Sequence, residues 1–158
     1  MLFYTVPYLF FFLPFTLLLF FMGGYFKIDR KIILILVSIF FYSWWNIYYL
    51  TVILFSIIIN YYFYKKLVSR ELNKKKTLLK GIALNVLVLI IFKYTDFIIE
   101  NINLVFSTSI SPLNLPFPLA ISFYTFQTIA FLINVYDEDI LDVKMKDFFL
   151  FIIFFPQL

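Results

Sequence analysis

The feature that most constrains this chain is an apolar run of 33 residues without a charged side chain, residues 32–64. As one straight α-helix, this run would be about 50 Å long at about 1.5 Å per residue. The hydrocarbon core of a bilayer is only about 30 Å thick, so we expect two membrane spans with a break between them. The break is predicted within residues 42–49, where tryptophans and tyrosines surround Asn46, because such aromatic belts mark membrane interfaces. Each half is short for a span, which predicts tilted helices or a locally thinned bilayer.

Clusters of charged residues divide the rest of the chain into further apolar blocks. Further spans are predicted over residues 2–26, 81–99 and 116–136, and a sixth apolar run begins at Phe148 and is only about eleven residues long. The first block has no basic n-region and no small-residue cleavage pattern, so we predict a retained span rather than a signal peptide. With 64% hydrophobic residues, the chain is more apolar than a soluble domain. The predicted fold class is all-α: a polytopic transmembrane protein with about five full spans and a truncated sixth, forming one incomplete domain over residues 1–158.

The distribution of lysine and arginine predicts the orientation. With the N-terminus outside, twelve of the 13 basic residues lie in three inner loops, residues 27–31, 65–80 and 137–147. Neither outer loop, 46–49 or 100–115, contains one. The positive-inside rule therefore predicts an N-out, multi-pass protein of the inner (cytoplasmic) membrane, with the lipid bilayer as its surroundings. We expect no nucleic-acid partner, because the cations lie in short loops between lipid-embedded helices.

The chain contains no histidine and no cysteine. Disulfides, Cys/His metal sites and a histidine base are therefore excluded for these residues. We find no glycine-rich phosphate loop, nucleophile elbow or metal-ligand spacing, and the acids within residues 137–142 do not match a calcium loop. The sequence therefore assigns no catalytic residue, no metal ligand and no bound cofactor.

The span predicted over residues 116–136 is unusually rich in hydrogen-bonding side chains near its start. These are Ser122, Tyr124, Thr125, Gln127 and Thr128. At about 100° per residue, one group shares roughly 120° of arc: Tyr124, Gln127, Thr128 and Asn134. A second group lies on a different side: Ser122, Thr125 and Tyr136. Two interpretations remain open, namely hydrogen bonding to neighbouring helices and the wall of a polar cavity that opens to the outside, where Pro116 and Pro118 shape the approach.

Three ionisable residues near the predicted outer end of the span 81–99 share a helix face, because Lys93, Asp96 and Glu100 are spaced i, i+3 and i+7. Such residues in a span usually face a bundle interior or an aqueous cavity. Alternatively, Lys93 pairs with Asp96 and extends toward the interface. The lysine-rich residues 65–80 could attract anionic lipids, although their role in orientation alone explains them.

Four strings occur in an order and spacing typical of one family. They are "FFYSWWNIYYL" (40–50), "FKYTDFIIENIN" (92–103), "LPFPLAISFYTFQTIAFLINVYDED" (115–139) and "FFLFIIFFPQL" (148–158). The chain resembles the N-terminal part of the membrane-bound O-acyltransferases, nearest to the branch of bacterial alginate O-acetyltransferases and D-alanyl teichoic-acid transfer proteins. The resemblance implies a ring of helices around a tunnel. It also implies an acyl donor, acyl-CoA or an acyl-carrier protein, at the cytoplasmic face, and a hydroxyl acceptor or acyl-relay protein outside. The candidate tunnel-lining residues are Lys93, Asp96, Glu100, Ser122, Tyr124, Gln127 and Thr128.

The essential histidine of that family lies beyond the "FFPQL" string, in a part that these 158 residues do not contain. The resemblance therefore implies an N-terminal fragment, inactive without the C-terminal half, of an enzyme that transfers acetyl or similar acyl groups to an extracytoplasmic polysaccharide or envelope polymer. Two alternatives stay open. One is a non-catalytic membrane subunit or degraded fragment, and the other is half of a small transporter whose path the same polar helix would line.

Overall fold

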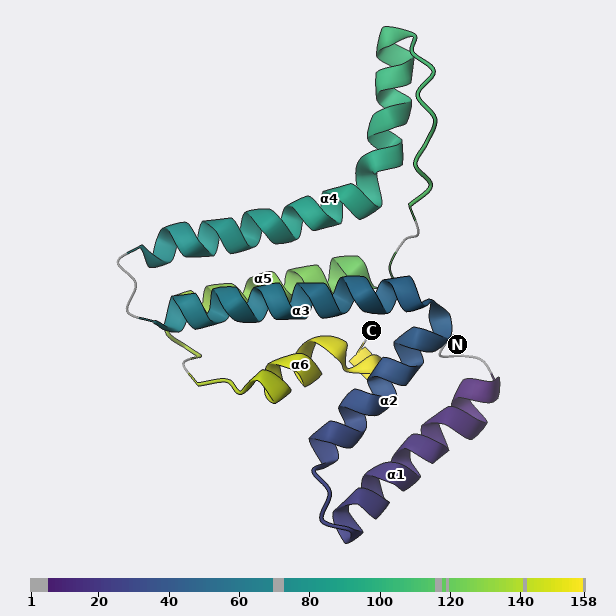
Figure 1. Cartoon of the computed structure of the whole chain (residues 1–158), viewed down its shortest axis with the longest axis vertical. Helices are drawn as coiled ribbons and strands as arrows, with labels where there is room; N and C mark the ends of the chain where they lie inside the picture. Colours follow the sequence, from purple (N-terminus) through teal and green to yellow (C-terminus); the bar gives the residue numbers. More distant parts are fainter. Residues whose placement is uncertain (1–5, 70–72, 116–117, 119, 141, 158) are drawn as a thin grey trace. The chain divides into compact units, whose positions relative to one another are not determined.

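The computed structural model describes residues 6–69, 73–115, 118, 120–140 and 142–157, and its regular elements are all helical (Figure 1). In chain order they are η1 (Tyr8–Phe12, a π-helical turn), α1 (Leu13–Tyr25), α2 (Arg30–Trp45), α3 (Ile47–Val68), α4 (Lys74–Phe106), α5 (Ile121–Tyr136), α6 (Met145–Ile153) and η2 (Phe155–Gln157, a 3₁₀ turn). The all-α prediction is confirmed. Two residues of the predictions above lie outside the described residues, namely Pro116 and Arg70, which is one of the basic residues of the predicted inner loop 65–80.

Within the part of the chain that the structure describes, three helices are long and apolar enough to cross a membrane: Tyr8–Tyr25, Ile47–Val68 and Lys74–Phe106. The helices α2 and α5 have 16 residues each, or about 24 Å at about 1.5 Å per residue. That is less than the roughly 20 residues of a standard span. Large apolar side chains such as Phe10, Phe21 and Phe97 are exposed along the candidate spans, as suits contact with lipid. The protein is therefore a helical membrane protein, whereas five full spans and the N-out orientation stay predictions.

The break predicted within residues 42–49 is confirmed at a single residue, Asn46. Its backbone is extended (φ −166°, ψ 128°) between the last residue of α2 and the first of α3. The Asn46 N–H donates to the Tyr42 carbonyl (3.2 Å), and its side-chain Oδ1 accepts from the Tyr48 N–H (2.9 Å). One residue therefore ends α2 and caps the start of α3, a role for which asparagine is well suited.

The chain divides into two compact units, each described by itself; the first comprises Met1–Ile57 and Asp142–Leu158. Here α1 turns back along α2, and a Cβ at Gly23 would overlap the Ile33 side chain, so a glycine permits their close approach. The helix α6 also packs on α2. An aromatic cluster closes the core, since the Phe155 ring lies 5.1 Å from Phe12 and 5.5 Å from Phe41 between centroids.

The sequence predicts the start of a sixth span after Phe148, but the structure forms a shorter element. The helix α6 has nine residues and ends at Ile153. The buried Phe155 N–H then donates to the Ser38 hydroxyl of α2 (3.2 Å). The helix leaves its helical conformation at Phe154 (ψ 104°), and it cannot continue through Pro156, because a proline in a helix interior lacks the N–H and clashes with the preceding turn. The "FFPQL" string therefore begins by folding against α2.

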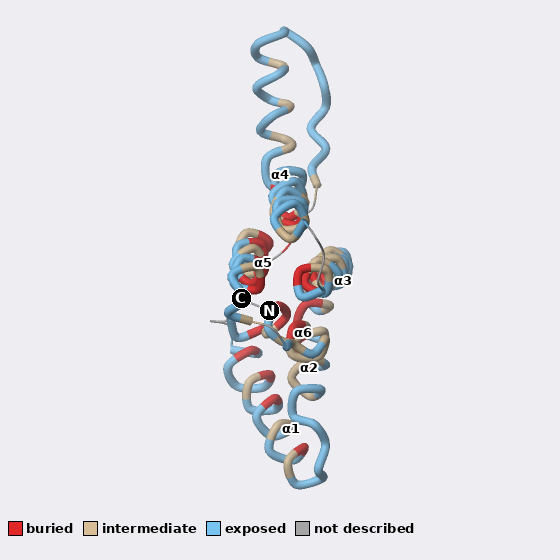
Figure 2. The backbone as a smooth tube through the Cα atoms, turned by 90° about the vertical axis from the view of Figure 1, so that its left-hand side faces the viewer, coloured by how far each residue is buried: buried red, intermediate tan, exposed pale blue. Residues whose placement is uncertain are grey.

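The second unit, Ile58–Leu141, contains the end of α3 together with α4 and α5. The span boundaries predicted at residues 81–99 are wrong at both ends, since α4 runs for 33 residues from Lys74 to Phe106. Neither flanking segment contains glycine or proline, so polarity alone did not interrupt the helix. It stops at Ser107, which adopts the left-handed conformation (φ 49°). The helix bends part-way along (Figure 1), and beyond the bend it is mostly exposed (Figure 2).

Candidate functional site

The buried face of α5 carries the polar residues of most interest. Its buried residues are Ile121, Tyr124, Thr125, Thr128, Phe131, Leu132 and Val135. They recur every three or four positions, as expected for one packed helix face. Three of them bear hydroxyl groups, and Ser122 and Gln127 beside them are half-buried. The grouping predicted from polarity is wrong for two residues, because Thr125 lies on the buried face and Asn134 is exposed. Apolar and hydroxyl-bearing side chains therefore share one buried face.

A buried pair of amides joins α3 to α4 in the same unit. The Asn60 Nδ2 donates to Asn85 Oδ1 (3.0 Å), and the Asn85 Nδ2 donates to Asn60 Oδ1 (2.6 Å) and to the Gly81 carbonyl (2.8 Å). A Cβ on Gly81 would lie 3.0 Å from Leu132 Cδ1, so α4 and α5 approach closely at this height. Because the two helices run antiparallel, a step of four residues along each brings Asn85 level with Thr128. The amide pair therefore lies at about the height of Thr128 along the two helices.

The hydroxyl groups of this face differ in how they are satisfied. The Thr128 hydroxyl donates to the Tyr124 carbonyl within α5 (2.6 Å), the local bond that threonine commonly makes in helices. The Tyr124 side chain is 1% exposed, and its hydroxyl has no hydrogen-bond partner among the described residues. Leaving such a group unpaired costs about 1–3 kcal/mol. It is therefore the polar atom of this face best placed to bond a ligand or a further protein segment.

The start of α5 is held in a strained conformation. Ala120, the N-cap residue, has φ 56° and ψ 23°, in the left-handed region that costs an alanine roughly 1–2 kcal/mol. The buried Pro118 precedes it, and its carbonyl accepts from the Ile121 N–H (3.3 Å). Strain of this kind is frequent at functional sites and persists where the surroundings fix it.

The three ionisable residues predicted on α4 make other contacts than those expected. Lys93 and Glu100 are exposed, and Lys93 Nζ lies 5.4 Å from the centroid of the adjacent Tyr94 ring. The Asp96 Oδ1 accepts from the backbone N–H groups of Leu113 (2.8 Å) and Asn114 (3.3 Å). Within the described part of α4, Asp96 forms no ion pair with Lys93. Asp96 is thus a structural anchor for the segment that follows α4.

Asn103 provides a second anchor, which the sequence did not reveal. Its Oδ1 accepts from the Ile110 N–H (2.9 Å) and the Thr108 hydroxyl (2.8 Å), while its Nδ2 donates to the Ile110 carbonyl (2.8 Å). The segment after Ser107 consequently runs back along the end of α4 (Figure 1). An asparagine shortly before a helix end was the only available signal, and it is common enough to be uninformative.

Ion pairs join the loops predicted to share the inner side. In the first unit, Lys31 bonds Asp147 (2.5 Å), and Lys146 bonds Asp29. The hydrogen bond from Lys146 holds the pKa of Asp29 below its usual value. In the second unit, Lys74 bonds Glu138 (2.8 Å) and lowers the pKa of that carboxyl.

No group of three metal-ligating side chains occurs in the described ranges. What the arrangement of α5 and its neighbours offers chemically is hydrogen bonding, with hydroxyl and amide groups in an apolar setting.

Comparison with known proteins identifies two relatives. Over 54% of its length the chain is 36% identical to a peptidoglycan O-acetyltransferase of Helicobacter pylori, and it covers 21% of that protein. Over 53% of its length it is 34% identical to a probable alginate O-acetylase of Pseudomonas aeruginosa, of which it covers 17%. No family model and no solved structure matches. The chain thus spans about a fifth of the length of these relatives.

Proposed function

From this distant homology to the membrane-bound O-acyltransferase family, which extends over about half the chain, we propose that the chain forms part of such an enzyme. The reaction is the transfer of acetyl or similar acyl groups to hydroxyls of an extracytoplasmic envelope polysaccharide. The observation that carries the proposal is the similarity to two proteins named as polysaccharide O-acetylases. The buried hydroxyl face of α5, led by Tyr124, supports it as a hydrogen-bonding wall for the reacting groups.

The chemistry limits what these residues contribute. Attack of a hydroxyl on an acyl carbonyl needs a base for its proton and hydrogen-bond donors for the developing oxyanion. The Tyr124 hydroxyl would act either as a hydrogen-bond donor to the oxyanion or as a group that positions the acceptor. These residues contain no histidine, so the base is proposed to come from the remainder of the enzyme, and residues 1–158 alone are proposed to be inactive.

The proposed setting follows the distribution of charge. We infer five spans with the N-terminus outside, in the cytoplasmic membrane, because twelve of the 13 cations then face the cytoplasm. An acyl donor, acyl-CoA or an acyl-carrier protein, would reach the tunnel from the cytoplasm. An acyl-relay protein or the polysaccharide itself would receive the acyl group outside.

A chimera tests the proposal. In it, this chain replaces the matching segment of the H. pylori peptidoglycan O-acetyltransferase, in a strain that lacks the native enzyme. We expect the chimera to restore O-acetylation of peptidoglycan and the chain alone to restore none. A chimera that inserts in the membrane at the native level yet transfers no acetyl groups would contradict the proposal. Restored acetylation by the chain alone would overturn the need for a base from elsewhere.

A further inference from the structure

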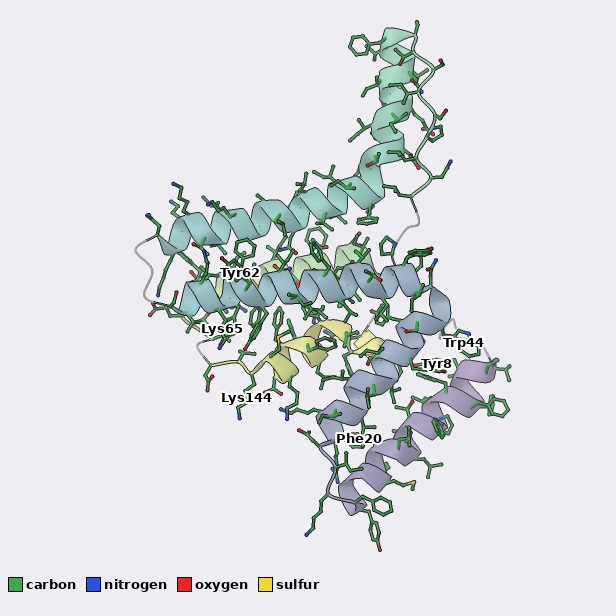
Figure 3. All side chains as sticks on the ribbon, in the orientation of Figure 1. Tyr8, Phe20, Trp44, Tyr62, Lys65 and Lys144 are labelled. Carbon is green, nitrogen blue, oxygen red and sulfur yellow. The ribbon has the colours of Figure 1, made fainter. Side chains whose placement is uncertain are left out.

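Lysines lie on tyrosine rings at the end of α3. The Lys65 Nζ is 5.4 Å from the centroid of the Tyr61 ring and 5.7 Å from that of Tyr64, and the Lys66 Nζ is 5.0 Å from that of Tyr62. Figure 3 labels Tyr62 and Lys65 at this end of the helix. Cation–π contacts at such distances hold an ammonium group against the ring. The two charges are therefore kept close to the last turns of a candidate membrane span.

The start of α4 adds further cations at the same end of the unit. Lys74, Lys75 and Lys76 form its first turn, which contains no acidic residue, and Lys80 follows. Of these four lysines, only Lys74 has an ion-pair partner among the described residues, Glu138. The side chains of Lys75, Lys76 and Lys80 are exposed. Cations at the positive end of a helix dipole are unfavourable by themselves, so these charges are not explained by the stability of α4.

We propose that this lysine platform, defined as Lys65 and Lys66 of α3 with Lys75, Lys76 and Lys80 of α4, binds the headgroups of anionic phospholipids. Tyrosine rings at a span end lie at headgroup depth, and lysines next to a span attract acidic lipids strongly. The orientation of the protein requires only the number of cations. It does not require ammonium groups held on rings at that depth.

A soluble acidic partner is the alternative occupant. Such a partner would be served by lysines that project freely into water. Lys65 and Lys66 instead lie over the rings of the span itself, where a phosphate oxygen of a neighbouring lipid can accept from them. The contacts on the α3 side of the platform therefore favour the lipid.

The test measures phosphatidylglycerol retained by the purified chain, titrated in detergent and counted by native mass spectrometry, with phosphatidylcholine as the neutral reference. The double variant Lys75→Gln/Lys76→Gln is compared with Lys27→Gln/Lys144→Gln, which removes the same charge from two exposed lysines elsewhere. We expect phosphatidylglycerol affinity to fall about fivefold per platform lysine, hence roughly 25-fold for the first variant. The second should stay within about twofold, and binding by the unmodified chain should weaken with added salt.

A third variant, Tyr61→Leu/Tyr62→Leu, keeps every charge and removes two rings; it should also bind phosphatidylglycerol more weakly. Circular dichroism verifies the helix content of each variant, and if the lysine variant loses helicity, Lys75→Arg/Lys76→Arg and the salt titration of the unmodified chain decide. If the two glutamine variants lost phosphatidylglycerol affinity equally, the effect would come from net charge alone, and this result would overturn the proposal. So would equal retention of phosphatidylglycerol and phosphatidylcholine, or retention of a soluble acidic protein without retention of phosphatidylglycerol.

Discussion

The buried amide pair of α3 and α4 gives a quantitative prediction about stability. Asn60 and Asn85 are 1% and 3% exposed and exchange two hydrogen bonds. Replacing Asn85 by leucine removes both bonds and leaves the Asn60 amide without its partner on α4. A buried polar group that loses its partner costs about 1–3 kcal/mol. We expect each single substitution, Asn60→Leu or Asn85→Leu, to destabilise the protein by that amount.

The double substitution separates pairing from packing. When both amides are replaced by leucine, no buried polar group is stranded, and such exchanges can be nearly neutral. Interhelical hydrogen bonds in membranes average about 0.6 kcal/mol, so two of them predict a coupling energy of about 1 kcal/mol. The double variant should therefore be destabilised by less than the sum of the single ones.

The assay is reversible unfolding of the chain in mixed detergent micelles. The fraction of denaturing detergent is increased stepwise, and the helix content is measured by circular dichroism. The free energies of unfolding of the four proteins form a double-mutant cycle. Ser43→Ala, whose hydroxyl bonds only within α2 in the described contacts, is the control for a local polar change. A cycle with additive single effects would refute the interpretation that the two amides recognise each other.

Three further predictions follow from the described contacts. Asp96→Ala should free the segment after α4, so that the amides of residues 113–114 exchange with deuterium faster while those within α4 do not. Cysteines placed at Ser69 and Ser109 should differ in intact cells, with an impermeant thiol reagent labelling only the latter if the N-terminus is outside. The pKa of Asp29 is lowered by its bond to a lysine, so its stabilising effect is present above the unfolded value of about 3.9 and is lost as the pH falls through the lower folded value. Asp29→Asn should thus lower the unfolding midpoint at neutral pH, and the difference from the unmodified chain should shrink in strong acid.

Local signals explain the parts of the fold that the sequence predicted. The break at Asn46 could be located because a capping residue and interfacial aromatics coincide there. The ends of α4 were missed for the opposite reason, since charged and polar residues alone do not stop a helix. It continues to Ser107, where a left-handed residue ends it.

The polar contacts were only partly predictable. The richness of α5 in hydroxyl groups was evident, but the burial of Thr125 depends on how α5 packs against its neighbours. The anchoring by Asp96 and Asn103 depends on the reversal of the chain after Ser107, with partners five to 18 positions away. Periodicity within one helix carries no information about such partners.

The hydroxyl face of α5 is proposed to take part in acyl transfer. The most direct test of this proposal is the rate of peptidoglycan O-acetylation by the chimera carrying Tyr124→Phe, which removes only the buried hydroxyl. Tyr136→Phe, near the other end of α5, is the matched control. We expect a roughly two- to 13-fold lower rate for Tyr124→Phe, which corresponds to about 0.5–1.5 kcal/mol from one hydrogen bond, at unchanged membrane insertion. Equal rates for the two variants and the unmodified chimera would contradict it.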